Sequence, residues 1–236
     1  MRYTNMFLLL LLYHSPVVAE ESTDQYIDFS VAYSRGDFNT GQKSELSQLQ
    51  VTYGQVMSDY DFSITIPYLF LQDSFGDESG LGDITLQAGK TLSGNNLDAD
   101  TVYASMSVKL PTADESSGLG TGEPDIGGFL SYTHNFNILS LTLMGGYIVT
   151  GDSQVQSYKD IFVYGVGLSK IITPWYVYGS LDGRQQTLDR GDDPLEFSVG
   201  FFYQLESARF FKMDAFVGLS NTSPDAGLTF GVVNWF

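Results

Sequence analysis

Apolar and polar residues alternate with a period of two through most of this chain. The clearest segment covers residues 60–70, whose apolar members are Tyr60, Phe62, Ile64, Ile66, Tyr68 and Phe70. Because successive side chains of a β-strand point to opposite faces, such a segment predicts a strand with one aromatic, apolar face and one small, polar face. No helical pattern of useful length interrupts these segments. The chain is therefore predicted to be all-β.

Segments of this kind recur about twelve times, each roughly ten residues long, which is the length a tilted strand needs to cross a bilayer. We expect them at residues 25–35, 45–54, 60–71, 83–93, 99–110, 125–136, 138–149, 160–171, 175–185, 195–205, 209–219 and 227–236. Long polar connections alternate with short ones, as external loops alternate with periplasmic turns in membrane barrels. The sequence thus predicts one antiparallel transmembrane β-barrel over residues 20–236, with both ends on the short-turn side.

A soluble β-sandwich would also show alternation, and it is the main structural alternative. In this chain the face opposite the aromatic residues is dominated by Ser, Thr, Gly, Gln and Asp. Such a face suits a wet lumen better than a dry core. Tyr60 and Tyr68 also share one face at a spacing suited to the two aromatic girdles of a membrane barrel. These features favour the barrel.

The N-terminus carries the pattern of a secretory signal. Residues 1–19 contain a positive charge at Arg2, a short apolar run from Met6 to Leu12, and small residues before a cleavage site after Ala19. The apolar run is too short to span a bilayer as a helix. We therefore expect export and placement in the outer membrane of a Gram-negative bacterium.

The charge balance is strongly acidic, with 11 Lys and Arg against 28 Asp and Glu and a net charge of −17, and the chain has no Cys. These counts exclude a nucleic-acid binder with a basic footprint, a disulfide scaffold and a thiolate metal site, and nothing indicates a cofactor. Many acids cluster in the predicted long loops: Asp73, Asp77, Glu78, Asp114, Glu115, Glu123, Asp125, Asp189, Asp192 and Asp193. We interpret them as solvated loops that repel anions, the alternative being divalent cations that bridge them to lipopolysaccharide.

Several charges fall on the polar face of the predicted strands: Asp28, Asp61, Lys109, Asp182, Arg184, Glu196, Lys212 and Asp214. Within a barrel of this size they either form ion pairs that close the interior or line a route for a solute. We expect five of them to line the passage, with an electrostatic and not a catalytic role: Asp28, Asp61, Lys109, Asp182 and Lys212.

Catalysis finds little support in the residues available. After removal of the signal the chain has one histidine, His134, on the apolar face near the short-turn end of its strand. A lipid-hydrolysing barrel needs a His beside a Ser near the outer rim, and no Ser is singled out here. His134 is best interpreted as a polar residue at the membrane interface.

Two motifs resemble a known family. Gly80-Leu81-Gly82-Asp83 opens one strand, and Val108-Lys109-Leu110-Pro111-Thr112 ends the next, followed by a glycine-rich stretch over residues 117–122 and by Asp125. This arrangement resembles the outer-membrane family called "MetA-pathway of phenol degradation", although Ala113 stands where that family usually has Gly. The resemblance implies an outer-membrane channel for aromatic or other hydrophobic compounds. We also expect Gly82 and Gly120 to adopt backbone conformations closed to other residues.

The C-terminal residue Phe236 shares a face with Val232, Phe230 and Leu228, an ending that resembles the signal by which the barrel assembly machinery recognises its substrates. The expected partners are this machinery, outer-membrane lipid with its lipopolysaccharide, and a small-molecule solute. The predicted function is passive diffusion of small solutes through the lumen. The alternative is a structural or adhesive barrel whose lumen is plugged by side chains.

Overall fold

The computed structural model describes residues 24–37, 43–74, 76–94, 100–136, 138–152, 158–188 and 191–236. The predicted signal, residues 1–19, lies outside them. The strands are β1 (Asp24–Asp37), β2 (Lys43–Met57), β3 (Tyr60–Asp73), β4 (Gly76–Leu81), β5 (Ile84–Ser93), β6 (Thr101–Leu110), β7 (Asp125–Phe136), β8 (Leu139–Val149), β9 (Ile161–Ile172), β10 (Trp175–Arg184), β11 (Leu195–Glu206), β12 (Arg209–Gly218) and β13 (Ala226–Trp235). Among these residues, no helix is long and apolar enough to cross a membrane.

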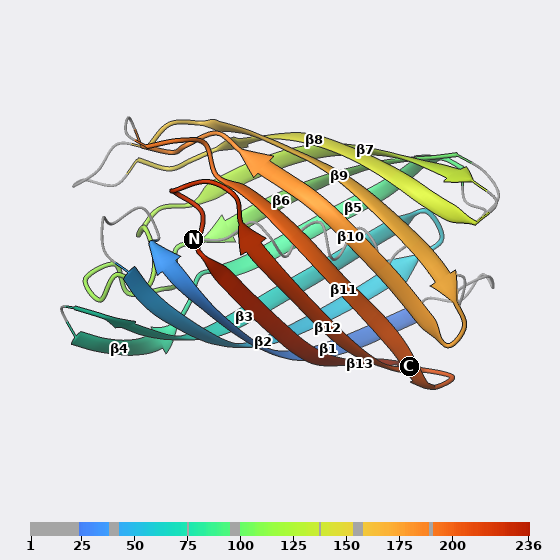
Figure 1. Cartoon of the computed structure of the whole chain (residues 1–236), viewed down its shortest axis with the longest axis horizontal. Coiled ribbons are helices and arrows are strands. Elements are labelled where there is room, and N and C mark those ends of the chain that lie inside the picture. The colour runs from blue at the N-terminus through green and yellow to red at the C-terminus, as the bar shows by residue number, and fades with distance from the viewer. Residues whose placement is uncertain are drawn as a thin grey trace.

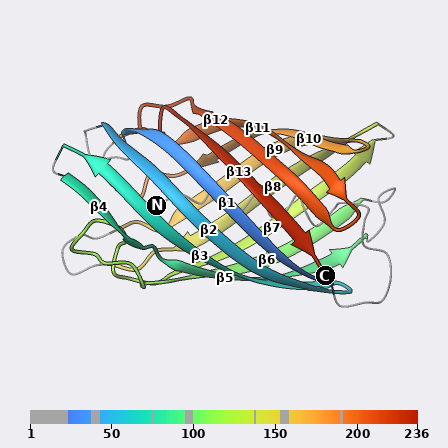
Figure 2. The same cartoon turned by 90° about the horizontal axis from the view of Figure 1, so that it is seen from below.

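The strands form one closed antiparallel barrel (Figures 1 and 2). Each strand pairs with the next one along the chain, except that β5 pairs with β3 and not with β4. β1 also pairs with β13, and β2 with β3, so the sheet closes. β4 and β5 both pair with the same side of β3 and lie end to end, separated only by Gly82 and Asp83. With β4 and β5 counted as one position, the described strands give the wall twelve strand positions, as the sequence predicts. The wall is closed because every backbone group in a bilayer needs a partner, which excludes open edges.

The two ends of the barrel differ as predicted. Figure 1 shows the long connections at its left end and the short ones, such as the turn between β11 and β12, at its right end. We call these the long-loop end and the short-turn end. The first and last strands meet at the short-turn end, where Gln25 and Phe236 exchange two backbone hydrogen bonds of 3.1 and 2.9 Å.

The β3–β4 hairpin differs from the prediction of a long polar loop over residues 72–82. β3 extends to Asp73 and pairs with β4 from Tyr68↔Leu81 to Asp73↔Gly76. Gly76 has a φ of 149°, and its N–H donates to the Asp73 carboxylate at the turn. Residues 76–79 of β4 are exposed on both faces, whereas Gly80 is half-buried beneath Leu119. The mainly polar sequence of β4 fits a strand that projects past the membrane-spanning wall and has no apolar face to bury.

The outer surface of the wall is apolar, as predicted. Its exposed side chains include Phe29, Val31, Leu49, Ile66, Met106, Leu130, Leu143, Leu168 and Val199. Tyr60 and Tyr68 also point outward. Aromatic side chains gather near the short-turn end, at Tyr132, Phe136 and Trp175, and near the long-loop end, at Tyr147, Phe162 and Tyr164. An apolar belt between two aromatic girdles is the surface that a bilayer requires.

Candidate functional site: the barrel interior and its long-loop end

The five residues predicted to line a passage lie on the inner face of the wall. Asp28 is on β1, Asp61 on β3, Lys109 on β6, Asp182 on β10 and Lys212 on β12. All except Asp182 are buried, with about one-twentieth of their surface exposed (5% each). The structure brings Asp28 and Lys212 together and leaves the others in separate contacts. Whether they line the path of a solute stays a prediction.

Lys212 forms an ion pair with Asp28 across an intervening strand. The lysine chain lies over Gly231 of β13, where an added Cβ would come within 2.5 Å of the lysine Cε. Only a glycine leaves room for the chain to cross β13 and reach β1. The pair satisfies two charges that would be costly if buried alone.

Two tyrosines repeat this arrangement with neutral donors. Tyr103 of β6 lies over Gly89 of β5 and donates to Asp61 of β3 at 2.8 Å. Tyr178 of β10 lies over Gly200 of β11 and donates to Asp214 of β12 at 3.1 Å.

In each of the three cases a long side chain lies along the wall over a glycine of the neighbouring strand. Its polar end contacts an Asp carboxylate on the strand after that one. The interior is thus braced across strands by its own side chains.

The remaining predicted residue, Asp182, accepts a hydrogen bond of 2.6 Å from Ser180 on its own strand. It lies directly opposite Glu196 of β11 in the register of the sheet. Glu196, Asp214 and Arg184 also occupy inward positions, as the alternation predicts.

The interior is not uniformly polar, which corrects the picture drawn from alternation alone. One cluster near the long-loop end contains Phe129, Ile148, Ile161 and Val163, and a second toward the short-turn end contains Tyr26, Tyr176, Tyr178, Phe202 and Val233. Met144 packs against both clusters, and Trp235 and Phe210 extend the second. Together they form a continuous apolar strip along the inner face of β7–β13 and β1, whereas Ser, Thr, Gln and Asp predominate on β2–β6.

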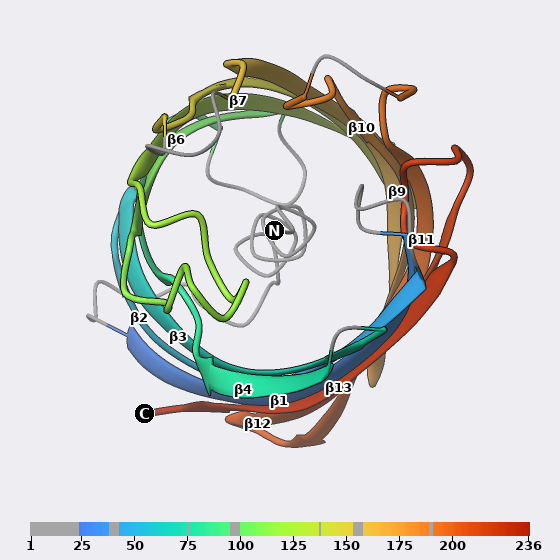
Figure 3. The same ribbon diagram turned by 90° about the vertical axis from the view of Figure 1, so that its left-hand side faces the viewer.

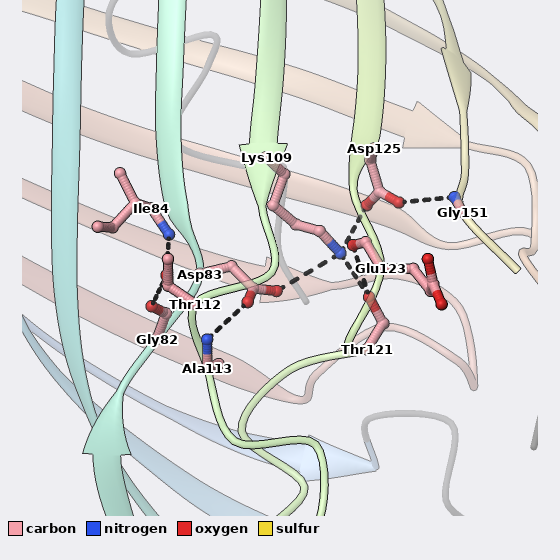
Figure 4. A network of polar contacts seen from close by, with 10 residues as sticks. All are labelled: Gly82, Asp83, Ile84, Lys109, Thr112, Ala113, Thr121, Glu123, Asp125 and Gly151. Atoms are coloured by element: carbon pink, nitrogen blue, oxygen red, sulfur yellow. Dashed lines mark hydrogen bonds and ion pairs between the residues drawn. The ribbon is translucent and has the colours of Figure 1, made fainter. Parts of the chain in front are cut away.

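At the long-loop end, Lys109 stands at the centre of a polar network (Figure 4). Its Nζ lies 2.8 Å from an Asp125 oxygen and 3.5 Å from an Asp83 oxygen, and it donates to Thr121 at 2.7 Å. The side chains of Lys109, Asp83 and Asp125 are 6%, 0% and 8% exposed. Asp125 also accepts from the Gly151 N–H. The network therefore joins β6, β7 and the residue that precedes β5 to the connections on both sides of β7.

Segment 111–124, which links β6 to β7, is tied to the wall by further contacts. The Ala113 N–H donates to Asp83 at 3.0 Å, and the Thr112 hydroxyl donates to the Gly82 carbonyl while accepting from the Ile84 N–H. Positive φ values occur at Gly118 and Gly122 (68° and 72°).

The expectation that Gly82 and Gly120 hold such conformations was wrong. Gly120 instead allows a close approach, since an added Cβ would lie 2.8 Å from an Asp83 oxygen.

The middle of segment 111–124 folds inward. Leu119 is buried with Leu69 and Ala113, and Leu46 and Leu71 pack against this cluster. Leu46, Leu69 and Leu71 are inward positions on β2 and β3, so the segment reaches from the β6–β7 side across the inner face of β4 and β3. Figure 3, which looks at the long-loop end, shows the segment inside the outline of the barrel.

Acids in the long loops serve local structure where their contacts are described. Hydrogen bonds from the hydroxyl and N–H of Ser116, and from the Ser117 hydroxyl, hold the pKa of Asp114 below its usual range. Asp192 and Asp193 contact neighbouring loop residues, and Asp189 lies outside the described residues. No group of three or more metal-ligating side chains occurs within the part of the chain that the structure describes.

His134 lies on the outer surface near the short-turn end. Its Nδ1 is 2.7 Å from Asp100, which also accepts a hydrogen bond from the Tyr132 hydroxyl, and its ring meets Phe136 edge to face. The hydrogen bond from Tyr132, with a smaller contribution from His134, lowers the pKa of Asp100. These are the contacts of a polar group within an aromatic girdle.

The comparisons with known proteins agree with this architecture. Residues 18–235 match the family described as "MetA-pathway of phenol degradation". The chain belongs to this family. The resemblance carried by the two motifs is thereby confirmed, and its motif residues Gly82, Asp83, Lys109, Thr112 and Asp125 are those of the network in Figure 4.

Solved structures share the fold of this family member at low sequence identity. It is similar to an outer membrane channel from Pseudomonas putida F1, with a TM-score of 0.74 and 15% identity over 93% of this chain and 97% of that one. It is also similar to the NanC porin, with a TM-score of 0.63 and 11% identity over 88% of this chain and 98% of that one. The translocator domain of autotransporter NalP from Neisseria meningitidis gives a TM-score of 0.60 and 10% identity over 98% of this chain and 95% of that one. Among curated proteins, none matches the sequence.

Sequence reasoning missed two parts of this family member's interior. The inward aromatic residues, such as Tyr176 and Phe202, were hidden because both faces of their strands carry large side chains. For Phe129 and Tyr178 the signal is a glycine directly opposite on the next strand, Gly146 and Gly200, and it can be recognised only once the register is known. Asp83 and Asp125 were noted as motif or loop residues, and their convergence on Lys109 was not foreseen.

Proposed function

We propose that this protein is a passive channel for small solutes in the outer membrane of a Gram-negative bacterium, with a preference for aromatic or other hydrophobic compounds. The observation that carries the proposal is the apolar strip, which extends through the interior from Ile148 and Ile161 to Tyr26 and Trp235. Its half-buried members, Met144, Phe210 and Trp235, leave surface at successive positions where a solute with an apolar face can replace water, so no single site binds it tightly.

The charges facing the interior would modulate this passage. Both buried lysines, Lys109 and Lys212, are engaged by carboxylates. The other described inward charges are four acids and one arginine, so the field that a solute meets would be negative: Asp61, Asp182, Glu196, Asp214 and Arg184. Together with the acidic loops, this favours neutral or cationic solutes over anions. Asp28 would contribute mainly by holding Lys212.

The setting of the channel is part of the same proposal. Residues 1–19 would direct export, the barrel assembly machinery would recognise the C-terminal strand through Phe236, and the acidic loops would face lipopolysaccharide. Recognition by the assembly machinery is supported by the alternation that ends in Phe236 and by the 66% exposure of the Phe236 side chain. We propose no catalytic role for His134.

A liposome assay on the strip tests the proposed preference. Met144 links the two apolar clusters, so Met144→Ser should slow permeation of a neutral aromatic probe such as phenol by about tenfold, the equivalent of ~1.4 kcal/mol of lost apolar contact. Met106→Ser, on the outer surface, is the matched control and should leave permeation unchanged. Equal rates for wild type and Met144→Ser would contradict a role for the strip.

The second candidate is a structural or adhesive barrel without transport. It is favoured by the three buried ion pairs and by the inward fold of segment 111–124. Planar-bilayer recording of the purified wild type distinguishes the candidates: stepwise conductance supports the channel, whereas persistent silence supports the closed barrel.

A further inference from the structure

Segment 111–124 is fixed to the wall through one buried cation. Lys109 lies between Asp83 and Asp125 and also donates to Thr121, near the far end of the segment. Without this cation two buried carboxylates would face each other, which costs free energy unless one of them moves or is protonated. The position of the segment is thus coupled to the charge of Lys109.

Movement of Asp83 would be passed directly to the segment. Its carboxylate accepts the Ala113 N–H, and Gly120 packs against its oxygens. Asp83 is completely buried (0% exposed side chain), so it cannot turn to solvent while these contacts persist. Release of Asp83 therefore frees both the start of the segment and the residue next to Leu119.

Leu119 determines where the segment lies. It is 5% exposed and packs in a cluster with Leu69, and it lies so close to Gly80 that a Cβ there would come within 2.9 Å of its Cδ1. These contacts hold the segment against the inner face of β3 and β4 at the long-loop end, inside the barrel outline of Figure 3. A solute that crosses this end must pass beside it.

We propose that Lys109 is a positioning residue that keeps segment 111–124 folded inward, and that this segment sets the largest solute the channel admits. The inference rests on the proposed channel function. It assigns one joint role to Asp83, Lys109 and Asp125, which the sequence presents as parts of separate motifs.

A thiol reporter measures the position of the segment independently of transport. The chain has no Cys, so Leu119→Cys introduces a single thiol at the buried anchor of the segment. Every further variant is compared with Leu119→Cys alone, in which the contacts of Lys109 are intact. In reconstituted protein, a membrane-impermeant maleimide should label Cys at position 119 slowly when Lys109 is present, and about tenfold or more faster with Lys109→Met, because local opening exposes it. Retained barrel structure is checked by the heat-dependent shift in gel mobility.

Two further variants separate the role of this lysine from a general loss of stability. Lys212→Met breaks the matched buried Lys–Asp pair on β12 and β1, and labelling at position 119 should stay at the wild-type rate. Thr121→Val removes one hydrogen bond of Lys109 and keeps both ion pairs, so labelling should be faster than with Thr121 present. This variant tests the inference even if Lys109→Met does not fold.

The size limit is measured by liposome swelling with neutral sugars of increasing length. The inference predicts that Lys109→Met admits larger sugars than wild type, together with faster labelling. Unchanged labelling overturns it, as does faster labelling with an unchanged size limit. If wild-type liposomes do not swell and Lys109→Met liposomes do, the result supports the positioning role of Lys109 and contradicts passive diffusion through the wild type. If labelling is faster with Lys109→Met but no variant makes liposomes swell, both the inference and the proposed channel are overturned.

Discussion

Two adjacent glycines on β8 offer a sharp test of how the interior is packed. Gly146 points inward beneath Phe129 of β7, its direct partner in the register, whereas Gly145 points outward. A Cβ added to Gly146 would lie 2.2 Å from the Phe129 Cδ1 and 2.9 Å from the carbonyl oxygen of Gly128. A Cβ added to Gly145 meets nothing within 4 Å.

These distances set the expected energies. Contacts below 3.0 Å are too short for a Cβ, so Gly146→Ala must move the Phe129 ring and shift part of β7, a form of overpacking that costs about 1–3 kcal/mol. Gly145→Ala should stabilise by about 0.4–1 kcal/mol, because alanine restricts the unfolded chain and meets no obstacle. The two variants should therefore differ in free energy of unfolding by about 1.5–4 kcal/mol.

Urea unfolding in lipid or detergent, followed by the fluorescence of Trp175 and Trp235, measures this difference. A double variant sharpens the result: with Phe129→Ala already present, Gly146→Ala should lose most of its cost, because the clashing ring is absent. Equal stabilities of Gly145→Ala and Gly146→Ala, or an unchanged cost in the Phe129→Ala background, would refute the assignment of Phe129 to a place over Gly146.

Three other outcomes follow from contacts described above. Lys212→Met should lower the free energy of unfolding by about 3–5 kcal/mol, because it leaves Asp28 buried without its cation; Lys212→Met combined with Asp28→Leu should restore much of it. Tyr132→Phe should raise the pKa of Asp100 toward its ordinary value in an NMR titration. The Asp100 carboxylate stabilises the fold above its unfolded pKa, and this contribution is lost as the pH falls through the folded pKa. In Tyr132→Phe the loss should therefore occur at a higher pH than in wild type. Deletion of Phe236 removes two backbone hydrogen bonds to the first strand and should reduce the yield of folded barrel on the heat-shift gel.

The barrel itself was accessible from the sequence because a membrane wall imposes one simple rule. Each spanning strand needs an apolar side toward lipid, so the period of two is strong, and the alternating loop lengths follow from antiparallel pairing. The rule fails where the wall ends: residues 76–81 form a strand beyond the apolar belt, and their Asp, Glu, Ser and Gly composition was taken for a loop.

The interior was less predictable because no comparable rule applies there. An inward position accepts Ser30, Asp28 or Tyr26 on the same strand, so composition alone does not distinguish a wet surface from an apolar strip. The contacts that matter join strands through their register: Lys109 faces Asp125 only because of the β6–β7 pairing. Lys109 and the two acids were each visible in the sequence, whereas their convergence was not.

The seam between β1 and β13 determines when this wall can become continuous. Its partners, from Tyr26↔Trp235 to Arg35↔Ala226, come from opposite ends of the described chain, so the cylinder seals only after every intervening hairpin has been placed. Formation of such distant contacts is intrinsically slow. Until then two strand edges stay unsatisfied, and any factor that shields or guides those edges acts on the slowest part of assembly.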